Sequence, residues 1–160
     1  MPKFLISETI YSERVNTVRG GTTASKHDNA ENGKAVKLAG LNNFVLCAAG
    51  DAIEAIQGSS HLATQGTVDG YAIIGIYGRG YKAVTFDGLQ ATPGTGTVAA
   101  GDYVLVGTVS PVGTALATSV KVTKATDQAV AKAAPFKARV VSLGVANTGA
   151  VGTTGVIELL

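Results

Sequence analysis

From Lys34 onward, short apolar and β-branched segments alternate with glycine-containing turns, and no other feature of the sequence constrains the fold as strongly. Pairs such as Gly50-Asp51, Asp87-Gly88 and Pro93-Gly94 separate the segments. Many short strands with turn signals between them are typical of a β-sandwich or a β-barrel. We therefore predict an all-β fold, a compact β-sandwich or small β-barrel, with strands at Ala35–Leu38, Phe44–Ala48, Ala52–Ile56, Tyr71–Tyr77, Tyr81–Phe86, Tyr103–Val109, Leu116–Val122, Phe136–Val145 and Gly155–Leu160.

Side chains alternate between the two faces of a strand, so the apolar positions of a segment indicate which face is buried. In the segment that starts at Phe136, Ala138 and Val140 share one face, and the apolar positions then change parity to Val141 and Leu143. A parity change of this kind indicates a β-bulge, in which one extra residue is inserted into a strand.

Two further stretches carry local signals. Ala125–Ala134 is alanine-rich and ends before Pro135, which fits a short surface helix or a loop. The tetrapeptide Ala48-Ala49-Gly50-Asp51 recurs as Ala99-Ala100-Gly101-Asp102, in each case before an apolar segment. We interpret the recurrence as two turns of the same kind at the entry to a strand.

Residues 1–33 differ from the rest of the chain. They hold an apolar series without clear periodicity, followed by a polar stretch of turn and loop residues from Ser25 to Gly33. We predict an extended N-terminal arm over residues 1–33, ordered by contact with another surface, and a β-sandwich or barrel domain over residues 34–160. The alternative, a strand and loop packed on the protein's own body, stays open at this stage. Fully extended, such an arm spans about 100 Å at about 3.3 Å per residue.

The composition indicates a thin core. Aromatic residues make up 6% of the chain and Trp is absent, so Val, Ile, Leu and Ala must supply the interior. A chain of this kind gains stability by burying more surface against partners, and we expect a homo-oligomer.

The formal net charge is +2, and the basic residues are spread singly along the chain. Nucleic-acid binding needs a clustered basic face, so we expect no nucleic-acid partner. The nearest approach to a basic and aromatic patch is a set that we interpret as ordinary strand and turn residues: Tyr77, Arg79, Tyr81 and Lys82.

Few side chains offer catalytic chemistry. Cys47 is the single cysteine and lies in an apolar run, so we expect a buried side chain and no intrachain disulfide. His27 lies in the polar part of the predicted arm, where we expect it to be exposed to solvent. His61 has Ser60 and Asp69 nearby, but no Gly-x-Ser-x-Gly motif is present. We therefore expect no catalytic residues and no enzyme activity; a hydrolase that uses His61 is a disfavoured alternative.

Metal and cofactor sites are not expected either. One cysteine and two distant histidines cannot form a structural zinc site without several carboxylates, and the acidic residues are dispersed. Most of the aspartates adjoin a turn glycine, where a carboxylate accepts hydrogen bonds from backbone N–H groups. The stretch Gly96–Tyr103 has the outline of a phosphate-binding loop, but Asp102 stands where such a loop requires lysine.

No apolar stretch reaches the length of a membrane span, and the first residues lack the apolar segment of a signal peptide. The single cysteine fits synthesis in a reducing compartment. We therefore expect no membrane partner and synthesis in the cytoplasm.

Residues 34–160 resemble the small Gly/Ala/Val/Thr-rich decoration (cement) proteins of tailed phages. The resemblance lies in the two segments Ala48–Ile53 and Ala99–Val106 and in the closing Val140–Gly144. The predicted arm is longer than expected for that family, and Ala125–Pro135 is a candidate insertion. The resemblance implies an all-β structural protein of the virion, often trimeric, that binds the outer surface of an expanded capsid and clamps neighbouring subunits of the major capsid protein.

The same resemblance implies a location on the capsid exterior after synthesis in the host cytoplasm. In that role an extended arm can add a strand to an exposed sheet edge of the capsid, and many symmetric copies strengthen weak single contacts. The residues expected to bind the capsid are apolar anchors and two arginines of the arm: Phe4, Ile6, Ile10, Tyr11, Arg14 and Arg19. The alternative is a virion fibre or spike module that binds host glycans, with Tyr71, Tyr77 and Tyr81 as its aromatic residues.

Overall fold

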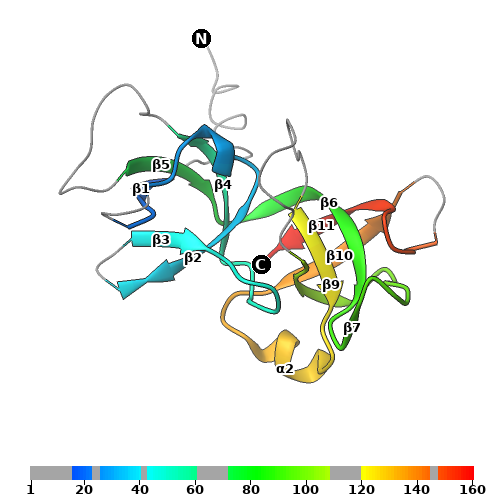
Figure 1. Cartoon of the computed structure of the whole chain (residues 1–160). Helices are drawn as coiled ribbons and strands as arrows, with labels where there is room; N and C mark the ends of the chain where they lie inside the picture. Colours follow the sequence, from blue (N-terminus) through cyan, green and yellow to red (C-terminus); the bar gives the residue numbers. More distant parts are fainter. Residues whose placement is uncertain (1–15, 23–25, 41–42, 61–71, 109–119, 145–147) are drawn as a thin grey trace, which may run out of the picture.

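The structure, a computed structural model, describes residues 16–22, 26–40, 43–60, 72–108, 120–144 and 148–160. Its strands form two small barrels (Figure 1), which confirms the predicted all-β fold. The first barrel consists of β1 (Asn16–Gly20), β2 (Ala35–Ala39), β3 (Asn43–Leu46), β4 (Ala55–Ser60) and β5 (Ala72–Tyr77). The second half of the chain supplies β6 (Gly80–Leu89), β7 (Thr92–Pro93), β8 (Tyr103–Val106), β9 (Val120–Lys124), β10 (Ala138–Leu143) and β11 (Thr154–Leu159).

The first barrel has the strand order β1-β3-β2-β4-β5 and is closed by an antiparallel pairing of β1 with β5. That pairing runs from Asn16 opposite Ile76 to Gly20 opposite Ala72. All other neighbours are antiparallel except β1 and β3, which are parallel. A parallel pair between the first and third strands requires the chain to cross over between them, and β2 makes that connection.

The second barrel repeats this arrangement with β6, β8, β9, β10 and β11 in place of β1 to β5. Its single parallel pair again joins the first and third strands, β6 and β9, and its closing pair again joins the first and last, β6 and β11. The remaining neighbours pair antiparallel in the same order as in the first barrel. Strand β7 is an addition that pairs only with the end of β6. The described chain therefore contains the same five-stranded topology twice.

The equivalent strands β4 and β10 also carry the same irregularity. The pairing of β4 with β5 shifts between Gln57 and Ser59, and the pairing of β10 with β11 shifts between Val140 and Ser142. The second shift confirms the β-bulge predicted from the parity change after Val140. At the first shift Gly58 is the extra residue.

One core fills the first barrel, and a larger one fills the second barrel and continues into the contact between the two. The first consists of Val36, Ala55, Ala72, Ile74 and Ile76, with Val18 and Phe44 packed against it. The larger one adds to the interior of the second barrel four buried residues from the first half of the chain: Ala35, Cys47, Ile53 and Ile56. Because successive side chains of a strand point to opposite faces, Ala35 packs on the second barrel while Val36 fills the first.

The described part of the predicted arm, residues 16–22 and 26–33, lies in and against the first barrel. Strand β1 lies within residues 1–33 and pairs with both β3 and β5, so it closes the first barrel. The short 3-10 helix η1 (Asn29–Glu31) packs on β4. Val18 packs against the core of the first barrel, so the apolar residues of β1 serve this protein's own interior. Residues 1–15 lie outside the described residues. Residues 34–160 contain four strands of the first barrel and all of the second.

The recurring tetrapeptide forms the same turn twice. In residues 48–51 and again in residues 99–102, the aspartate carboxylate accepts a hydrogen bond from the first alanine's N–H, at 2.6 and 2.7 Å. The glycines have φ angles of 86° and 91°, in the left-handed region that favours glycine. Each glycine N–H then donates to a strand of the second barrel, to the carbonyl of Val106 in one case and of Val140 in the other, both at 2.8 Å. The first of these turns therefore ties the two halves of the chain together.

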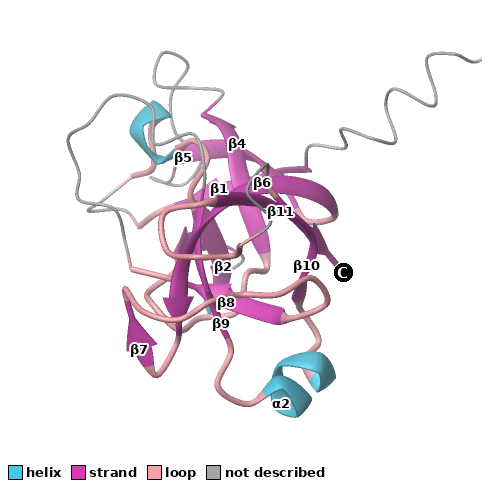
Figure 2. Cartoon of the chain, turned by 90° about the vertical axis from the view of Figure 1, so that its right-hand side faces the viewer, coloured by secondary structure: helices cyan, strands magenta, loops and turns pink. Residues whose placement is uncertain are grey.

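Two helical segments of the described residues, η1 and α2 (Gln128–Ala133), lie at opposite ends of the described molecule (Figure 2). Ala125–Ala134 fitted either a short surface helix or a loop, and the structure shows the helix, α2. Asp127 caps it by accepting hydrogen bonds from the N–H groups of Ala129 and Val130, each at 3.0 Å. Neither helical segment of the described chain has the length and apolar character that a membrane crossing needs.

Candidate functional site

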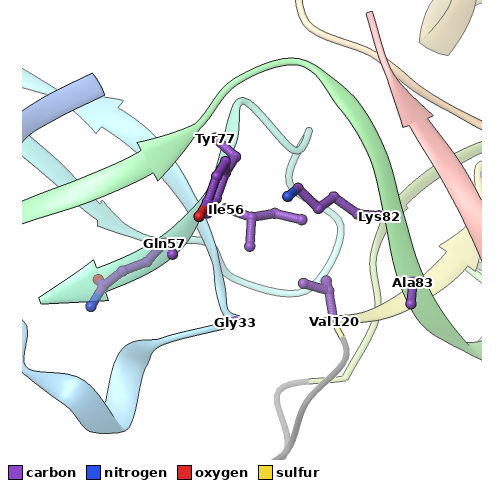
Figure 3. Close-up of a pocket in the computed structure, with 8 residues that line it drawn as sticks. Gly33, Ile56, Gln57, Tyr77, Lys82, Ala83 and Val120 are labelled. Carbon is purple, nitrogen blue, oxygen red and sulfur yellow. The ribbon is translucent and has the colours of Figure 1, made fainter. Parts of the chain in front are cut away.

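A pocket of about 200 Å³ lies at the junction of the two barrels (Figure 3). Ile56 extends from the first barrel towards Lys82 and Val120 of the second. Ile56 and Val120 are buried and belong to the larger core, so the floor of the pocket is apolar. The full lining comes from β4, β5, β6, the start of β9 and the turn before β2: Gly33, Ile56, Gln57, Gly58, Tyr77, Lys82, Ala83 and Val120.

The ring of Tyr77 forms one wall of this pocket because Gly58 leaves room for it. Ile56 and Tyr77 are opposite each other on β4 and β5, so their side chains share the face that looks towards the second barrel. A Cβ atom on Gly58 would lie 2.6 Å from Cδ2 and 2.7 Å from Cζ of the Tyr77 ring, closer than real Cβ contacts. The bulge residue is therefore a glycine for a steric reason: one edge of the Tyr77 ring lies against it.

Lys82 contacts the Tyr77 ring. Its Nζ lies 3.7 Å from the ring centroid, within the range of a cation–π interaction. The two residues come from consecutive strands, β5 and β6, which are joined by a two-residue turn. Their contact places a positive charge beside the apolar floor that Ile56 and Val120 provide.

A buried polar network lies on the other side of β4. Gln57 has no exposed surface, and its amide Nε2 donates to the carbonyl of Asp28 at 2.8 Å and to Oδ1 of Asn32 at 3.1 Å. Its Oε1 is therefore an acceptor, and Nδ1 of His27 donates to it at 3.0 Å. This network joins η1 and the segments around it to the wall of the first barrel.

The expectation that His27 is exposed to solvent is wrong. His27 is 7% exposed, because η1 and the turn that follows cover the end of the first barrel over it. Burial lowers the pKa of the imidazole below its usual value, partly opposed by the hydrogen bond to Gln57. His27 is therefore neutral at pH 7 and carries its proton on Nδ1, the nitrogen that donates to Gln57.

A second pocket, of about 210 Å³, lies beside His27 and is lined by Gly21, Thr22, Lys26, His27, Glu31, Val45 and Leu46. The Glu31 carboxylate already accepts from the N–H of Asp28 at 2.8 Å and pairs with Lys34 at 3.5 Å. Among the described residues, no group of three or more His, Cys, Asp or Glu side chains is placed to hold a metal ion.

The described aspartates have structural partners. Asp51 and Asp102 stabilise the two equivalent turns, as predicted, and pair with Lys37 at 2.6 Å and Lys124 at 2.9 Å. Asp87 differs from that prediction, because it is buried in β6 and accepts hydrogen bonds from the backbone N–H and the hydroxyl of Thr108. The position of Asp102 in a turn, bonded to a lysine from β9, is that of a turn-stabilising carboxylate.

Cys47 is buried, as predicted, with its thiol 3.6 Å from the carbonyl of Ala52. Burial, with a smaller contribution from Asp51, raises the pKa of the Cys47 thiol to about 12. A thiol with such a pKa holds almost no thiolate at pH 7 and is a poor nucleophile.

The outer face of the second barrel presents a row of large polar and aromatic side chains. Tyr81 of β6 is opposite Glu158 of β11, which is opposite Arg139 of β10, which is opposite Tyr103 of β8. Arg139 and Glu158 form an ion pair at 2.9 Å, and Tyr81 is 64% exposed. Val141, the bulge residue of β10, is 42% exposed on the adjoining surface. We call these four residues, Tyr81, Arg139, Val141 and Glu158, the outer patch.

Of the six residues predicted to bind a partner, the structure describes only one. Arg19 lies in β1, opposite Asn43 and Ile73, so it belongs to the barrel wall and not to a free arm. The other predicted contacts lie outside the described residues: Phe4, Ile6, Ile10, Tyr11 and Arg14. The same holds for His61 and Tyr71 of the two alternative functions.

The pocket residues were partly visible in the sequence. Tyr77 and Lys82 belong to the set that we interpreted as ordinary strand and turn residues, and the structure shows them in contact with each other. Gln57 and Gly58 gave no signal, because a Gln-Gly-Ser-Ser run has the composition of a loop. Their roles depend on η1 and Tyr77, which are distant in the chain.

The chain matches no protein-family model, and the searches of curated proteins and of solved structures give no match. We therefore infer function from the residues, the fold and the surface.

Proposed function

We propose that this chain is a capsid decoration (cement) protein that binds the outer surface of a tailed-phage capsid and stabilises the shell of major capsid protein, without catalytic turnover. The resemblance of its sequence to such proteins motivates the proposal. The fold is compatible with it, because two closed barrels offer large outer surfaces. Asp51, Asp102 and Asp127 are already bonded within turns and a helix cap, Asp87 is bonded to Thr108, and Gln57 belongs to the network at His27.

The observation that carries the proposal is the outer patch. An exposed tyrosine next to an arginine and an aliphatic residue has the composition enriched in protein–protein interfaces. Exposed ion pairs such as Arg139–Glu158 contribute little to the stability of a single chain, typically about 0–1 kcal/mol. The same charged groups contribute more to the choice and orientation of a partner.

The closure of the barrels also bears on how a strand could be shared with the capsid. The backbone groups of β1–β5 and of the second barrel pair within each barrel. A strand donated to a sheet edge of the capsid must therefore come from a segment outside the barrels. Residues 1–15 precede β1 and contain the apolar anchors Phe4, Ile6, Ile10 and Tyr11, with Arg14 as a polar contact. We assign capsid binding to this segment together with the outer patch.

The test is co-sedimentation with expanded capsids that lack decoration protein. We expect binding to be abolished by removal of residues 1–15 and weakened by Arg139→Glu, while far-ultraviolet circular dichroism stays unchanged. Removal should stop at residue 15, because residues 16–20 form β1 and close the first barrel. Leu38→Ala, at an exposed position of β2 in the first barrel, is the matched control. Undiminished binding of both variants would refute the assignment.

The proposal includes a homotrimer, the state that suits a local three-fold position on a capsid. Light scattering should give three times the 16.1 kDa mass of the chain. A monomer at capsid-saturating concentration would contradict the trimer while leaving capsid binding to be judged by sedimentation.

One observation favours a second candidate, a glycan-binding module of a virion fibre or spike. Tyr81 is an exposed ring beside a carboxylate and a guanidinium, and sugars stack on aromatic rings while their hydroxyl groups bond such polar groups. Tyr77 is less suited, because Lys82 lies over its ring and one ring edge packs against Gly58. Binding on a glycan array that Tyr81→Ala abolishes would favour this candidate over capsid decoration.

A further inference from the structure

The two barrels correspond residue by residue as well as strand by strand. Ala35 of β2 and Tyr103 of β8 take the same position, since the carbonyl of each accepts at 3.0 Å from the residue after the third strand, Cys47 or Ala125. The strand register then pairs positions of the first barrel with positions of the second: Val36 with Val104, Leu38 with Val106, Ile56 with Arg139, and Tyr77 with Glu158. Ile53 and Phe136 also correspond, because they lie two residues before β4 and β10.

The first barrel buries one face against the second barrel. We call it the joint face, and its buried apolar residues are Ala35, Cys47, Ile53 and Ile56. Figure 3 shows Ile56 of this face extending towards Val120 of the second barrel. The last residue of β8, Val106, bonds the turn before β4: its carbonyl accepts from the Gly50 N–H at 2.8 Å, and its N–H donates to the Asp51 carbonyl at 2.9 Å. The joint face and this turn therefore bind an aliphatic strand end, through side-chain burial and through backbone hydrogen bonds.

The corresponding face of the second barrel is exposed. Phe136 is 45% exposed, whereas Ile53, at the same position of the first barrel, is 2% exposed. Three residues of the outer patch take positions beside it that belong to the joint in the first barrel: Arg139 that of Ile56, Val141 that of Gly58, and Glu158 that of Tyr77. Phe136 and the outer patch are thus the second barrel's version of a face that the first barrel uses for docking.

We propose that Phe136 and the outer patch together receive a strand end of the major capsid protein, with an aliphatic side chain of the capsid packed on the Phe136 ring. The inference rests on the proposed function and deepens it, because it gives the chemistry of the capsid surface that the outer patch contacts. Phe136 supplies the aromatic anchor that is typical of the centre of an interface. Arg139 and Glu158 then lie at the rim, where charged pairs orient a partner.

A second copy of this chain is the less suitable occupant. Its first barrel would have to offer Leu38, which corresponds to Val106. The N–H of Leu38 already donates to Oε2 of Glu54 at 2.8 Å, so the backbone group that Val106 uses at the joint is bonded within the same barrel. The major capsid protein must therefore supply the strand end.

Photocross-linking of the full-length protein on expanded capsids tests this contact. Phe136 is replaced by the photoreactive amino acid benzoylphenylalanine, which keeps an aromatic ring at that position. The matched control carries the same amino acid at Leu38, which is also an exposed apolar position. Denaturing gels separate links to the major capsid protein from links between two copies of the chain, and mass spectrometry locates the capsid residue that is linked.

We expect links from position 136 to aliphatic residues at a strand end of the major capsid protein, at least about tenfold more abundant than links from position 38. In co-sedimentation, Phe136→Ala should weaken capsid binding at least about tenfold, and Phe136→Leu by less than about threefold because an apolar side chain remains. Circular dichroism checks that both variants fold.

Links from position 136 to a second copy would overturn the proposal, since they would place another molecule of this chain on the face. Co-sedimentation without links at position 136, or undiminished binding of Phe136→Ala, would also overturn it and leave the proposed function standing. Failure of the wild-type protein to sediment with capsids would instead refute the proposed function, and this inference with it.

Discussion

The contact between Gly58 and Tyr77 makes a sharp prediction about Gly58→Ala. The added methyl group has no room, because one edge of the Tyr77 ring lies against Gly58. The substitution must therefore displace the ring, which also contacts Lys82 Nζ at 3.7 Å from the ring centroid. Gly58 does not adopt a left-handed backbone conformation, so the effect of the methyl group is steric.

The magnitude follows from three contributions. Overpacking costs about 1–3 kcal/mol, and loss of the Lys82–Tyr77 contact costs a further ~0.5–1 kcal/mol. Replacement of glycine by alanine in a strand returns about 0.5–1 kcal/mol through the lower conformational entropy of the unfolded chain. We therefore expect Gly58→Ala to lower the free energy of unfolding by about 1–3 kcal/mol.

Urea denaturation followed by circular dichroism measures this change as a shift of the midpoint at constant slope. In a Tyr77→Ala background the ring is gone, and the added cost of Gly58→Ala should fall below about 0.5 kcal/mol. Gly40→Ala is the matched control, because a Cβ atom at Gly40 meets nothing within 4 Å. A cost for Gly58→Ala that is the same with and without the Tyr77 ring would refute the steric account.

Three other predictions concern the interior. Gln57→Ala should lower the free energy of unfolding by about 3–5 kcal/mol in urea denaturation, because it leaves a cavity and removes the hydrogen bonds of Gln57 to His27 and Asn32. A loss under about 1 kcal/mol would contradict the network. Burial lowers the pKa of His27, so the unfolded chain binds more protons as pH drops through 6.5. The contribution of His27 to stability should therefore be constant above that pH and be lost below it. His27→Gln should flatten the profile of urea midpoints in that range. The Cys47 thiol, with a pKa of about 12, should react with Ellman's reagent at about pH 8 only after unfolding; fast reaction of the native protein would disprove its burial.

The sequence predicted those parts of the fold that depend on near neighbours along the chain. Alternation of apolar side chains gave most of the strands, and the parity change after Val140 gave the bulge in β10. The two Ala-Ala-Gly-Asp turns were recognisable because a glycine with positive φ and an aspartate that bonds the backbone act within four residues. Strand β4 was placed too early, ending at Ile56, because Gly58 and the serines after it have turn composition although they continue the strand.

The site shows the same division. Tyr77 and Lys82 could be named from the sequence, but their contact with each other could not, since it depends on how the turn between β5 and β6 aims the two side chains. The burial of His27 was missed for a related reason: its partner Gln57 lies thirty residues away, and a polar segment carries no sign of what will cover it. The predicted arm contacts Phe4, Ile6, Ile10, Tyr11 and Arg14 stay predictions.

By itself the sequence determined that the chain is all-β, where most strands and turns fall, and that its core is aliphatic. Only the tertiary structure decided that the strands close into two barrels of one topology, that β1 completes the first of them, and that Ala35 and Ile56 join the core of the second. The physical reason is range. Side-chain alternation and turn conformation are set by residues a few positions apart. Strand order, parallel pairing and the burial of short segments depend on contacts between residues tens of positions apart. Many different pairings of the same strands would satisfy the local sequence pattern equally well, so the pattern does not select among them.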